Sequence, residues 1–308
     1  MLVKRKSVGA KTPAKKILTR FRPQIRSRHP SHSPLRRELP LLPWRSIVRL
    51  GSTTSGDGLA SRIEINSVRG IKNSADKLKM KQCFTQAGVK TARWWYTWTP
   101  QFQNEIDNNI PHTINFMESK KGTNNAIITT PNLISNLPYP IIAKHRFGSR
   151  GTGNYKLDTQ QALQQWMIGK DLSNYIFEEF VKMSREYRLH ISKNGCFYAC
   201  RKLLRMDAPE GTWQRHDDVV TWALESNPSF KKPNNWEAIV ADCIRAQTAL
   251  GLDICAFDVM VQGSKKGKER INPEWIIVES ASAPSFGDIT TQKYIEEIPK
   301  LIKDKANR

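Results

Sequence analysis

Two acidic residues interrupt neighbouring apolar segments near the C-terminal end of the sequence. Asp258 lies within the apolar run 254–261, and Glu279 ends the next such run, after a polar stretch that is typical of a turn. If the two runs form a hairpin, the midpoint of the two acids falls at the centre of that turn, which places their Cβ atoms about 5 Å apart across the strands. Two carboxylates this close repel each other unless a cation lies between them or one of them is protonated. Magnesium suits such a pair, because it binds through one or two carboxylates and the phosphates of a substrate. The alternative is an acid that is paired or protonated within a structural network.

A glycine-rich loop follows the strand that the apolar pattern predicts over residues 139–146. Alternation along this strand places Lys144 and Arg146 on one face. The loop is flexible, and its successive N–H groups can form an anion-binding nest. Its candidate ligand-binding residues are Ser149, Arg150, Gly151, Thr152 and Gly153. The spacing is neither a Walker A motif nor a Rossmann fingerprint, so a plain hairpin turn is the alternative.

Two further acids, Glu178 and Glu179, lie in the apolar strand predicted over residues 175–181. A carboxylate in such surroundings is costly unless it is ion-paired or hydrogen-bonded, which favours a binding role. An edge strand with solvated acids is the alternative.

Three basic residues are candidates for binding an anion. Lys77 lies in the first turn of a predicted helix, where a cation opposes the helix dipole unless an anionic ligand is bound there. Arg188 and Lys202 lie in successive strands of a hairpin that the Asn-Gly pair at 194–195 turns. Solvated surface charges are the alternative for all three.

The elements that must position these residues follow from periodicity. Helices are predicted from an N-cap at Asn73 to a stop at Gly88, over 235–250 and over 290–303. Strands are expected at 47–50, 93–98, 139–146, 155–157, 175–181, 187–192, 196–204, 254–261 and 275–278. The expected fold class is therefore α+β, with a mainly antiparallel sheet and helices packed on it.

The 308-residue chain has a formal net charge of +21, and this charge is concentrated at the N-terminus. Residues 1–45 hold 13 basic residues against one acid, together with six prolines, which break helices and cannot donate to a sheet. Because such a segment buries too little apolar surface to offset its ordering entropy, we expect residues 1–43 to be disordered. Three roles stay open for them: an arm that contacts nucleic acid or an acidic partner, an organelle transit peptide, or a linker without a part in the chemistry.

Composition excludes several classes of protein. No stretch approaches the roughly 20 apolar residues that cross a bilayer, so an integral membrane protein is excluded. The basic start is not followed by the apolar segment of a secretory signal peptide. The five cysteines fit no zinc spacing, so we expect reduced, mostly buried thiols in an intracellular, cytoplasmic protein.

Taken in order, several short motifs resemble the ATP-grasp superfamily. The resemblance is closest to carboxylate–amine ligases of the ribosomal-protein glutamate ligase and D-alanine–D-alanine ligase type. The chain is also similar to small ATP-grasp proteins of tailed phages, which implies a location in the host cytoplasm. The matching motifs are Asn73–Lys77, Pro140–Lys144 with the glycine loop, Glu178–Val181, Glu186–Arg188, Asp258 and Glu279–Pro284.

This resemblance implies an ATP-grasp fold, in which two α+β subdomains clasp ATP. It covers about residues 66–303 and leaves the basic tail outside. The implied organisation is a disordered tail (1–43), a short N-terminal α/β segment (44–73) and an ATP-grasp domain (74–308).

The resemblance also implies how a nucleotide is held. Lys77 and Lys144 would bind the α- and β-phosphates, and the loop 149–153 would close over the triphosphate. The adenine hinge would consist of Glu178, Glu179, Phe180 and Val181. Backbone groups of Glu179 and Val181 would read the edge of the base.

The remaining implied roles concern the reaction. Glu186 would bind the ribose hydroxyls, while Asp258 and Glu279 would carry Mg²⁺. Arg188 and Lys202 would neutralise the γ-phosphate and an acyl-phosphate intermediate. The expected function is an ATP- and Mg²⁺-dependent ligase that joins a carboxylate to an amine, acting on an amino acid, a peptide or a protein. Such phosphoryl transfer needs positioning and charge neutralisation more than a protein nucleophile.

Two features depart from the family pattern. The family has Glu-x-Asn at the second metal position, but Ala281 occupies the place of the asparagine here, so a second metal is absent or another residue, such as Asn272, supplies the oxygen. The segment before the motifs is also shorter than the substrate domain of many members. A non-catalytic ATP-binding structural protein, or a nucleic-acid-associated protein acting through its tail, are therefore the alternative functions. His216 either contacts substrate or lies on the surface.

Overall fold

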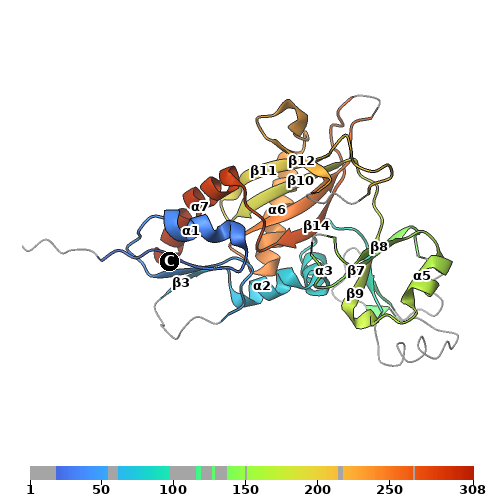
Figure 1. Ribbon diagram of the computed structural model, residues 1–308, viewed down its shortest axis with the longest axis horizontal. Coiled ribbons are helices and arrows are strands. Elements are labelled where there is room, and N and C mark those ends of the chain that lie inside the picture. Colours follow the sequence, from blue (N-terminus) through green and yellow to red (C-terminus); the bar gives the residue numbers. More distant parts are fainter. Residues whose placement is uncertain are drawn as a thin grey trace, which may run out of the picture.

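Three sheets organise the chain, and helices pack against each of them (Figure 1). The computed structural model describes residues 19–54, 62–97, 137–149, 151–213, 218–265 and 268–308, together with the backbone of 116–118 and 127–128. Two of the sheets are antiparallel, and the third, which is the smallest, is parallel. The α+β class that the sequence predicts is confirmed.

The smallest sheet belongs to what we call the N-terminal unit. Its elements are β1 (Gln24–Arg26), η1 (Pro30–His32), α1 (Ser33–Glu38), β2 (Ser46–Arg49), β3 (Ile63–Ile65) and α7 (Asp288–Ala306). Ile25, Leu35 and Leu39 are buried in one cluster with Tyr294 and Ile298 of α7. The two ends of the described chain are thus packed together in one small core.

The prediction that residues 1–43 are disordered is wrong for the part that forms β1 and α1. Apolar residues spaced among the arginines give these elements one buried face, and α7 supplies the surface that covers it. Burial of that face offsets the entropy that these residues lose on ordering. The composition alone suggested that this segment buries too little apolar surface to do so. Residues 1–18 of the expected tail lie outside the described residues.

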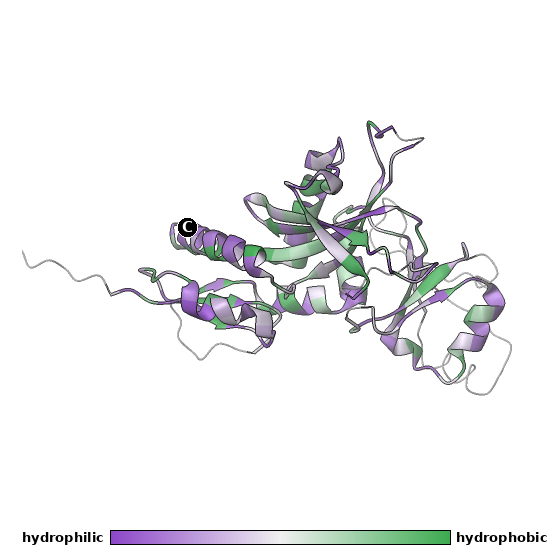
Figure 2. Cartoon of the chain, turned by 45° about the horizontal axis from the view of Figure 1, so that its top comes forward, coloured by the Kyte–Doolittle hydropathy of each residue, from purple (hydrophilic) through white to green (hydrophobic). Residues whose placement is uncertain are grey.

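The central sheet has the strand order β12-β11-β10-β13-β14. Its strands are β10 (Arg185–Ser192), β11 (Gly195–Leu204), β12 (Val220–Leu224), β13 (Ile254–Val261) and β14 (Trp275–Ala281). One face is covered by α6 (Trp236–Leu250), where Tyr187, Phe257 and Val259 share a core with Ile239. The apolar residues of the sheet and of the facing helices can be followed in Figure 2.

The opposite face of the central sheet is only partly covered. At one end α7 packs on it, and the His190 Nδ1 lies 3.1 Å from the Tyr294 hydroxyl. Side chains two residues apart along a strand share a face, so Arg188 and Glu186 continue the same face beyond this contact. They line a pocket instead of a core.

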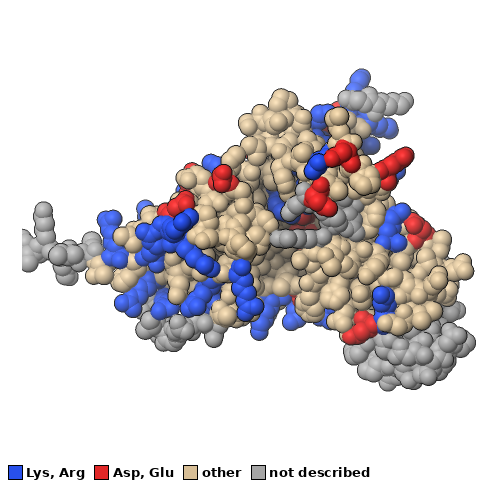
Figure 3. Space-filling view, in the orientation of Figure 1, with Lys and Arg blue, Asp and Glu red and all other residues tan. Residues whose placement is uncertain are grey.

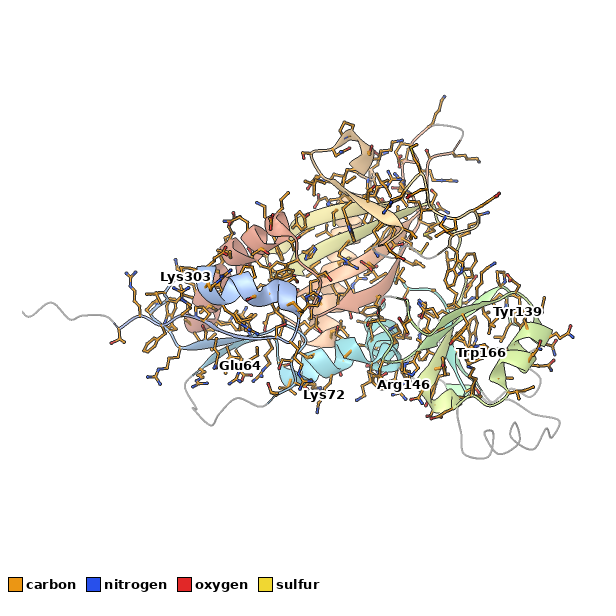
Figure 4. The ribbon with its side chains drawn as sticks, in the orientation of Figure 1. Glu64, Lys72, Tyr139, Arg146, Trp166 and Lys303 are labelled. Carbon is orange, nitrogen blue, oxygen red and sulfur yellow. The ribbon has the colours of Figure 1, made fainter. Side chains whose placement is uncertain are left out.

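The second antiparallel sheet has the order β6-β5-β4-β9-β7-β8. Its strands are β4 (Trp94–Tyr96), β5 (Phe116–Glu118), β6 (Ile127–Ile128), β7 (Ile141–His145), β8 (Asn154–Leu157) and β9 (Tyr175–Glu179). The helix α5 (Gln160–Met167) covers one face, where Leu163 packs with Phe177. The ring of Trp166 on the same helix lies edge-on to Tyr175 at 4.8 Å (Figure 4). Two short 3-10 helices complete the described elements, η3 (Leu172–Asn174) and η4 (Pro228–Phe230).

Two helices connect the larger sheets, α2 (Val68–Ala75) and α3 (Lys77–Gln86). On α3, Leu78 packs with Trp94 of the six-stranded sheet. Met80 and Phe84, from other faces of the same helix, belong to the core beneath the central sheet. This helix therefore fixes the two sheets that border the pocket.

The predicted N-cap at Asn73 is wrong. The backbone is extended at Asp76 (φ −100°, ψ 108°), which separates α2 from α3 where one helix was expected. The Asp76 carboxylate caps α3 by accepting the N–H of Leu78 at 3.0 Å. Asn73 lies inside α2, and its side chain donates to the carbonyl oxygen of Leu250.

Candidate functional site

A pocket of about 870 Å³ lies between the central sheet and the six-stranded sheet. Its volume is in the range of small-molecule and cofactor sites. Many of the residues predicted to act in the site line it: Lys144, Ser149, Gly151, Glu178, Glu179, Phe180, Val181, Glu186, Arg188, Lys202, Asp258 and Glu279. Further lining residues that the sequence reasoning did not select include His29, Trp213, Asp218, Met260 and Ser285.

The pairing of the two strands that carry the acids confirms the prediction that these residues are cross-strand neighbours. Asp258 and Glu279 are direct cross-strand partners in the β13–β14 register. Arg188 pairs with Asp258 from the other side, so three charged residues form one row across the sheet. A β-bulge after Asp258 allows both Val278 and Glu279 to line the pocket.

Asp258 is held by two cations. Arg188 forms a two-pronged contact, with its Nε 2.8 Å from Oδ1 and its second nitrogen 2.9 Å from Oδ2. The Lys202 ammonium donates to Oδ2 at 2.8 Å. Burial by itself would raise the pKa of the Asp258 carboxyl, but the charges and hydrogen bonds of both cations outweigh it and hold the pKa well below its ordinary value. Asp258 is therefore ionised at neutral pH.

Lys202 links a second carboxylate to this row. Its ammonium also donates to Glu186 Oε1 at 2.5 Å. Burial would lower the pKa of Lys202, but Asp258 and Glu186 outweigh it, so the pKa is raised and the charge is kept. Glu186, which the resemblance places at the ribose, is thus ion-paired with Lys202, a predicted catalytic residue. Both belong to the charged face of the central sheet that lines the pocket.

Glu279, the other member of the acidic pair, contacts Lys77. The Lys77 Nζ is 3.1 Å from Glu279 Oε1 and also donates to the carbonyl oxygen of Gly148. Lys77 is the first residue of α3, which agrees with the prediction that it lies in the first turn of a helix; it is buried and is not among the residues that line the pocket. It ties the start of the helix to both the acidic pair and the glycine loop.

The opposite wall carries a buried ion triad. Glu178 Oε2 lies 2.9 Å from the Lys144 ammonium and 3.3 Å from that of Lys81. Burial would raise the pKa of Glu178, but the two lysines outweigh it, so the pKa is lowered. Burial dominates at Lys81, which has no exposed surface, and lowers its pKa to about 8.

Lys81, a buried ion-pair partner of the lining residue Glu178, was missed by the sequence reasoning. It lies four residues after Lys77 on α3, and therefore on the same side of the helix. A lysine at that spacing, next to the apolar stripe that contains Met80 and Phe84, was the available signal.

The glycine loop only partly matches its prediction. Ser149 and Gly151 line the pocket, Thr152 and Gly153 do not, and Arg150 lies outside the described residues. Gly153 has a φ of +79°, and a Cβ there would lie 2.7 Å from the His145 Cβ. The loop thus needs glycine for its close approach to β7.

Arg146 does not share the pocket face with Lys144, contrary to the alternation argument. β7 ends at His145, so the strand geometry no longer directs Arg146. Its guanidinium donates to both carboxylate oxygens of Asp76, at 3.0 and 2.6 Å (Figure 4 labels Arg146). It binds the six-stranded sheet to the start of α3 instead of facing a ligand.

The predicted hinge lies where β9 ends. The N–H of Glu179 donates to Arg93 and that of Phe180 to Pro140, so these two donors are occupied. The N–H of Val181 has no hydrogen-bond acceptor in the described part of the chain, and Val181 lines the pocket. Of the two backbone positions expected to read a base, only Val181 has an available donor.

Several other expectations concern metal and thiol chemistry. Ala281 lines the pocket and offers no side-chain oxygen, and Asn272 is not among the lining residues. Among the described residues no group of three or more His, Cys, Asp or Glu side chains can hold a metal. All five cysteines are free, as expected, and three of them are buried. His216 lies outside the described residues.

Comparison with known proteins gives structural likenesses only. No protein-family model and no curated protein matches the sequence. Among the described residues, no helix is both long and apolar enough to traverse a lipid bilayer.

The similar solved structures include ATP-grasp ligases. D-alanine–D-alanine ligase from Bacillus anthracis is 13% identical with a TM-score of 0.47, over 79% of this chain and 69% of that one. The ATP-grasp ligase PsnB, in complex with a minimal precursor, is 13% identical with a TM-score of 0.47, over 79% of this chain and 65% of that one. N5-carboxyaminoimidazole synthase from Aspergillus clavatus is 12% identical with a TM-score of 0.46, over 77% of this chain and 52% of that one. The chain thus spans less than two thirds of the last two structures.

Proposed function

We propose that this protein is an ATP- and Mg²⁺-dependent ligase that joins a carboxylate to an amine through an acyl phosphate. The substrate class that we propose is an amino acid, a peptide or a protein. The proposal rests on one observation: a row of Arg188, Asp258 and Glu279 on one sheet faces Lys144 on another across a pocket of about 870 Å³.

The charges around the pocket suit a triphosphate. Five cations, Lys77, Lys81, Lys144, Arg188 and Lys202, are paired there with four carboxylates, Glu178, Glu186, Asp258 and Glu279. Buried cations already desolvated at the site can donate hydrogen bonds to phosphate oxygens without losing further hydration. The unoccupied N–H of Val181 is a donor for the edge of a base.

The acidic pair has the donor chemistry that magnesium prefers. Asp258 is ionised, and both acids present carboxylate oxygens on adjacent strands of the pocket. Magnesium binds through one or two carboxylates together with substrate phosphates, so a third protein ligand is not needed. Asp258 and Glu279 would hold it, and the ion would supply neutralisation of the phosphate charge.

The protein side chains themselves would position the reactants. Arg188 is fixed by Asp258, and Lys202 is fixed by Asp258 and Glu186, so both cations are preorganised before substrate arrives. Preorganised charge stabilises a transferring phosphoryl group without reorganisation during the reaction. The amine then displaces phosphate from the activated carboxylate, which forms the amide bond and releases inorganic phosphate.

The test is turnover in the presence of candidate acceptors. The full chain is incubated with ATP, Mg²⁺ and pools of amino acids and peptides, and ADP release and mass gains from new amide bonds are measured. Hydroxylamine in place of the amine should trap the acyl phosphate as a hydroxamate. ATP that binds but is never split with any acceptor would contradict the proposal.

Matched variants sharpen this test. Asp258→Asn keeps the shape of the side chain but removes the charge that fixes both cations, so we expect turnover to fall by about 100-fold or more. Asp207→Asn removes an acid that is exposed and paired with Arg205, and it should leave turnover unchanged. Equal activity in both variants would refute the role of Asp258.

A second candidate is a nucleotide-binding protein without turnover. It is favoured by Ala281, which lines the pocket at the position where the family supplies an oxygen. This alternative predicts ATP binding by calorimetry with no ADP formed, and unchanged biological function in Asp258→Asn.

A further inference from the structure

The N-terminal unit has an unusual choice of basic residues. Between residues 19 and 62 all nine lysine-or-arginine positions are arginine. Arginine presents a rigid fork of donors that matches phosphate and carboxylate geometry, whereas lysine is a flexible point charge. The composition of this segment therefore favours directed anion recognition over a generally solvated basic surface.

The parallel topology gathers three of these arginines at one edge. Arg45 immediately precedes β2, Arg62 immediately precedes β3, and Arg22 comes two residues before β1. Because all three strands are parallel, their first residues lie at the same edge of the sheet. Residues from this edge, together with Arg36 of α1, line a cavity of about 500 Å³.

The guanidinium groups at this edge are positioned but not neutralised. Arg45 lies over the ring of Phe21 at 4.9 Å, and Arg36 donates to the carbonyl oxygen of Ser27 at 2.8 Å. Arg62 donates to the neutral side chain of Gln24, at 3.4 Å. Among the described residues no carboxylate forms an ion pair with any of these arginines or with Arg22.

A second and independent feature of this cavity is an unsatisfied polar group. Ser46, the first residue of β2, lines the cavity and is only 4% exposed. Its hydroxyl is buried and has no hydrogen-bond partner in the described part of the chain. Buried hydroxyls are nearly always paired, and this one belongs to a residue that lines the cavity beside Arg45.

Basic charge continues beyond the cavity. Arg20, Arg28 and Arg37 are exposed on the same segments, and Lys and Arg side chains gather over this unit in Figure 3. A small phosphate in the cavity would leave these charges unused, whereas a chain of regularly spaced phosphates would use them. We propose that this arginine edge binds the phosphate backbone of a nucleic acid.

The test measures binding of a fluorescent single-stranded oligonucleotide of about 20 nucleotides to the full chain, over a range of salt concentrations. The variant replaces Arg22, Arg45 and Arg62 with glutamine. The logarithm of the binding constant falls linearly with the logarithm of the salt concentration, and each phosphate contact on a single strand contributes about 0.7 to this slope. Losing three contacts should therefore reduce the slope by about 2 and weaken binding about 100-fold at about 0.1 M salt. Arg22→Gln alone should weaken binding about 5-fold, and thermal unfolding checks that each variant is folded.

The matched control removes the same net charge elsewhere. Lys232, Lys265 and Lys268 are exposed, lie outside the N-terminal unit and are replaced together with glutamine. This control should change binding only slightly, because distant exposed charges are screened. An equal loss in the control would overturn the proposal, since net charge alone would then explain binding.

Two competitors test the chemistry of the partner. Polyglutamate that binds as tightly as the oligonucleotide would overturn the proposal in favour of an acidic protein. Tripolyphosphate that displaces the oligonucleotide at one equivalent would overturn it in favour of a small-phosphate site. Displacement only by another nucleic acid supports the proposal. This result does not depend on whether the larger pocket splits ATP.

Discussion

The buried triad of Lys81, Glu178 and Lys144 makes a prediction about stability that pH can test. Lys81 has no exposed surface, and its pKa falls from the ordinary value of a lysine to about 8 in the folded protein. In the unfolded chain its pKa returns to about 10.4. Between these two pKa values the unfolded state binds more protons than the folded state, so the free energy of unfolding rises with pH through this interval. Below it both states bind the proton, and the gain is absent.

The magnitude follows from the two pKa values. Each unit of pH over which one proton separates the two states is worth about 1.36 kcal/mol. Raising the pH from about 7 to about 9.5 should therefore stabilise the wild type by about 2 kcal/mol relative to Lys81→Met, which lacks the group. Taking the difference between the two proteins removes the contributions of the tyrosines and cysteines that also titrate at high pH.

The assay is urea unfolding of both proteins at each pH, with the two unfolding slopes checked for equality. At neutral pH, Lys81→Met should cost less than about 1.5 kcal/mol, because methionine has a similar volume and Glu178 keeps Lys144 as its partner. Glu178→Gln should instead cost about 3 kcal/mol, because it leaves two buried ammonium groups without a counter-charge. A wild-type stability that does not rise relative to Lys81→Met, or a Glu178→Gln variant as stable as Lys81→Met, would refute this account.

Two other predictions concern the rest of the fold. Burial lowers the pKa of His190 to about 3, so this residue contributes stability above about pH 6.5 that is lost as the pH falls. The wild type should lose about 2–3 kcal/mol more than His190→Phe between about pH 7 and pH 4.5, measured by urea unfolding. A Cβ on Gly70 would lie 2.3 Å from the carbonyl oxygen of Gly251, so Gly70→Ala should be destabilised by about 1–3 kcal/mol despite the better helix propensity of alanine. Gly287→Ala, whose Cβ meets nothing within 4 Å, serves as its control and should stay within about 1 kcal/mol.

Sequence reasoning succeeded where a signal is local. Apolar runs bounded by turn residues located β13 and β14, and hairpin symmetry placed Asp258 opposite Glu279. An antiparallel pair joined by one connection has its register set by the connection, so two positions in the sequence suffice to predict their contact. Arg188 and Lys202 lie in adjacent strands of the hairpin that the Asn-Gly pair predicts, although the register places Glu186 and not Arg188 opposite Lys202.

The same reasoning failed where partners are distant in sequence. The parallel pairing of β1 with β2, and the packing of Leu35 against α7, join segments whose local composition is dominated by charge and proline. Lys81 was missed because its counter-charge, Glu178 of β9 in the six-stranded sheet, is distant in sequence from α3. Arg146 was misplaced because the alternation argument assumes that a strand continues, and β7 ends one residue earlier.

The position of the pocket depends on where α7 stops covering one face of the central sheet. Along β10, His190 is buried beneath Tyr294, while Arg188, two residues away on the same face, borders the pocket. Alternation gives these residues equal orientation, so only the cover supplied by α7 separates core from site. The N-terminal unit also contributes His29 to the lining of the pocket, and His32 Nε2 donates a hydrogen bond to the carbonyl oxygen of Pro284, another lining residue. Removing residues 1–43 would therefore expose the core face of α7 and open one end of the pocket, which is why nucleic-acid binding must be tested by substitutions at the arginine edge and not by truncation.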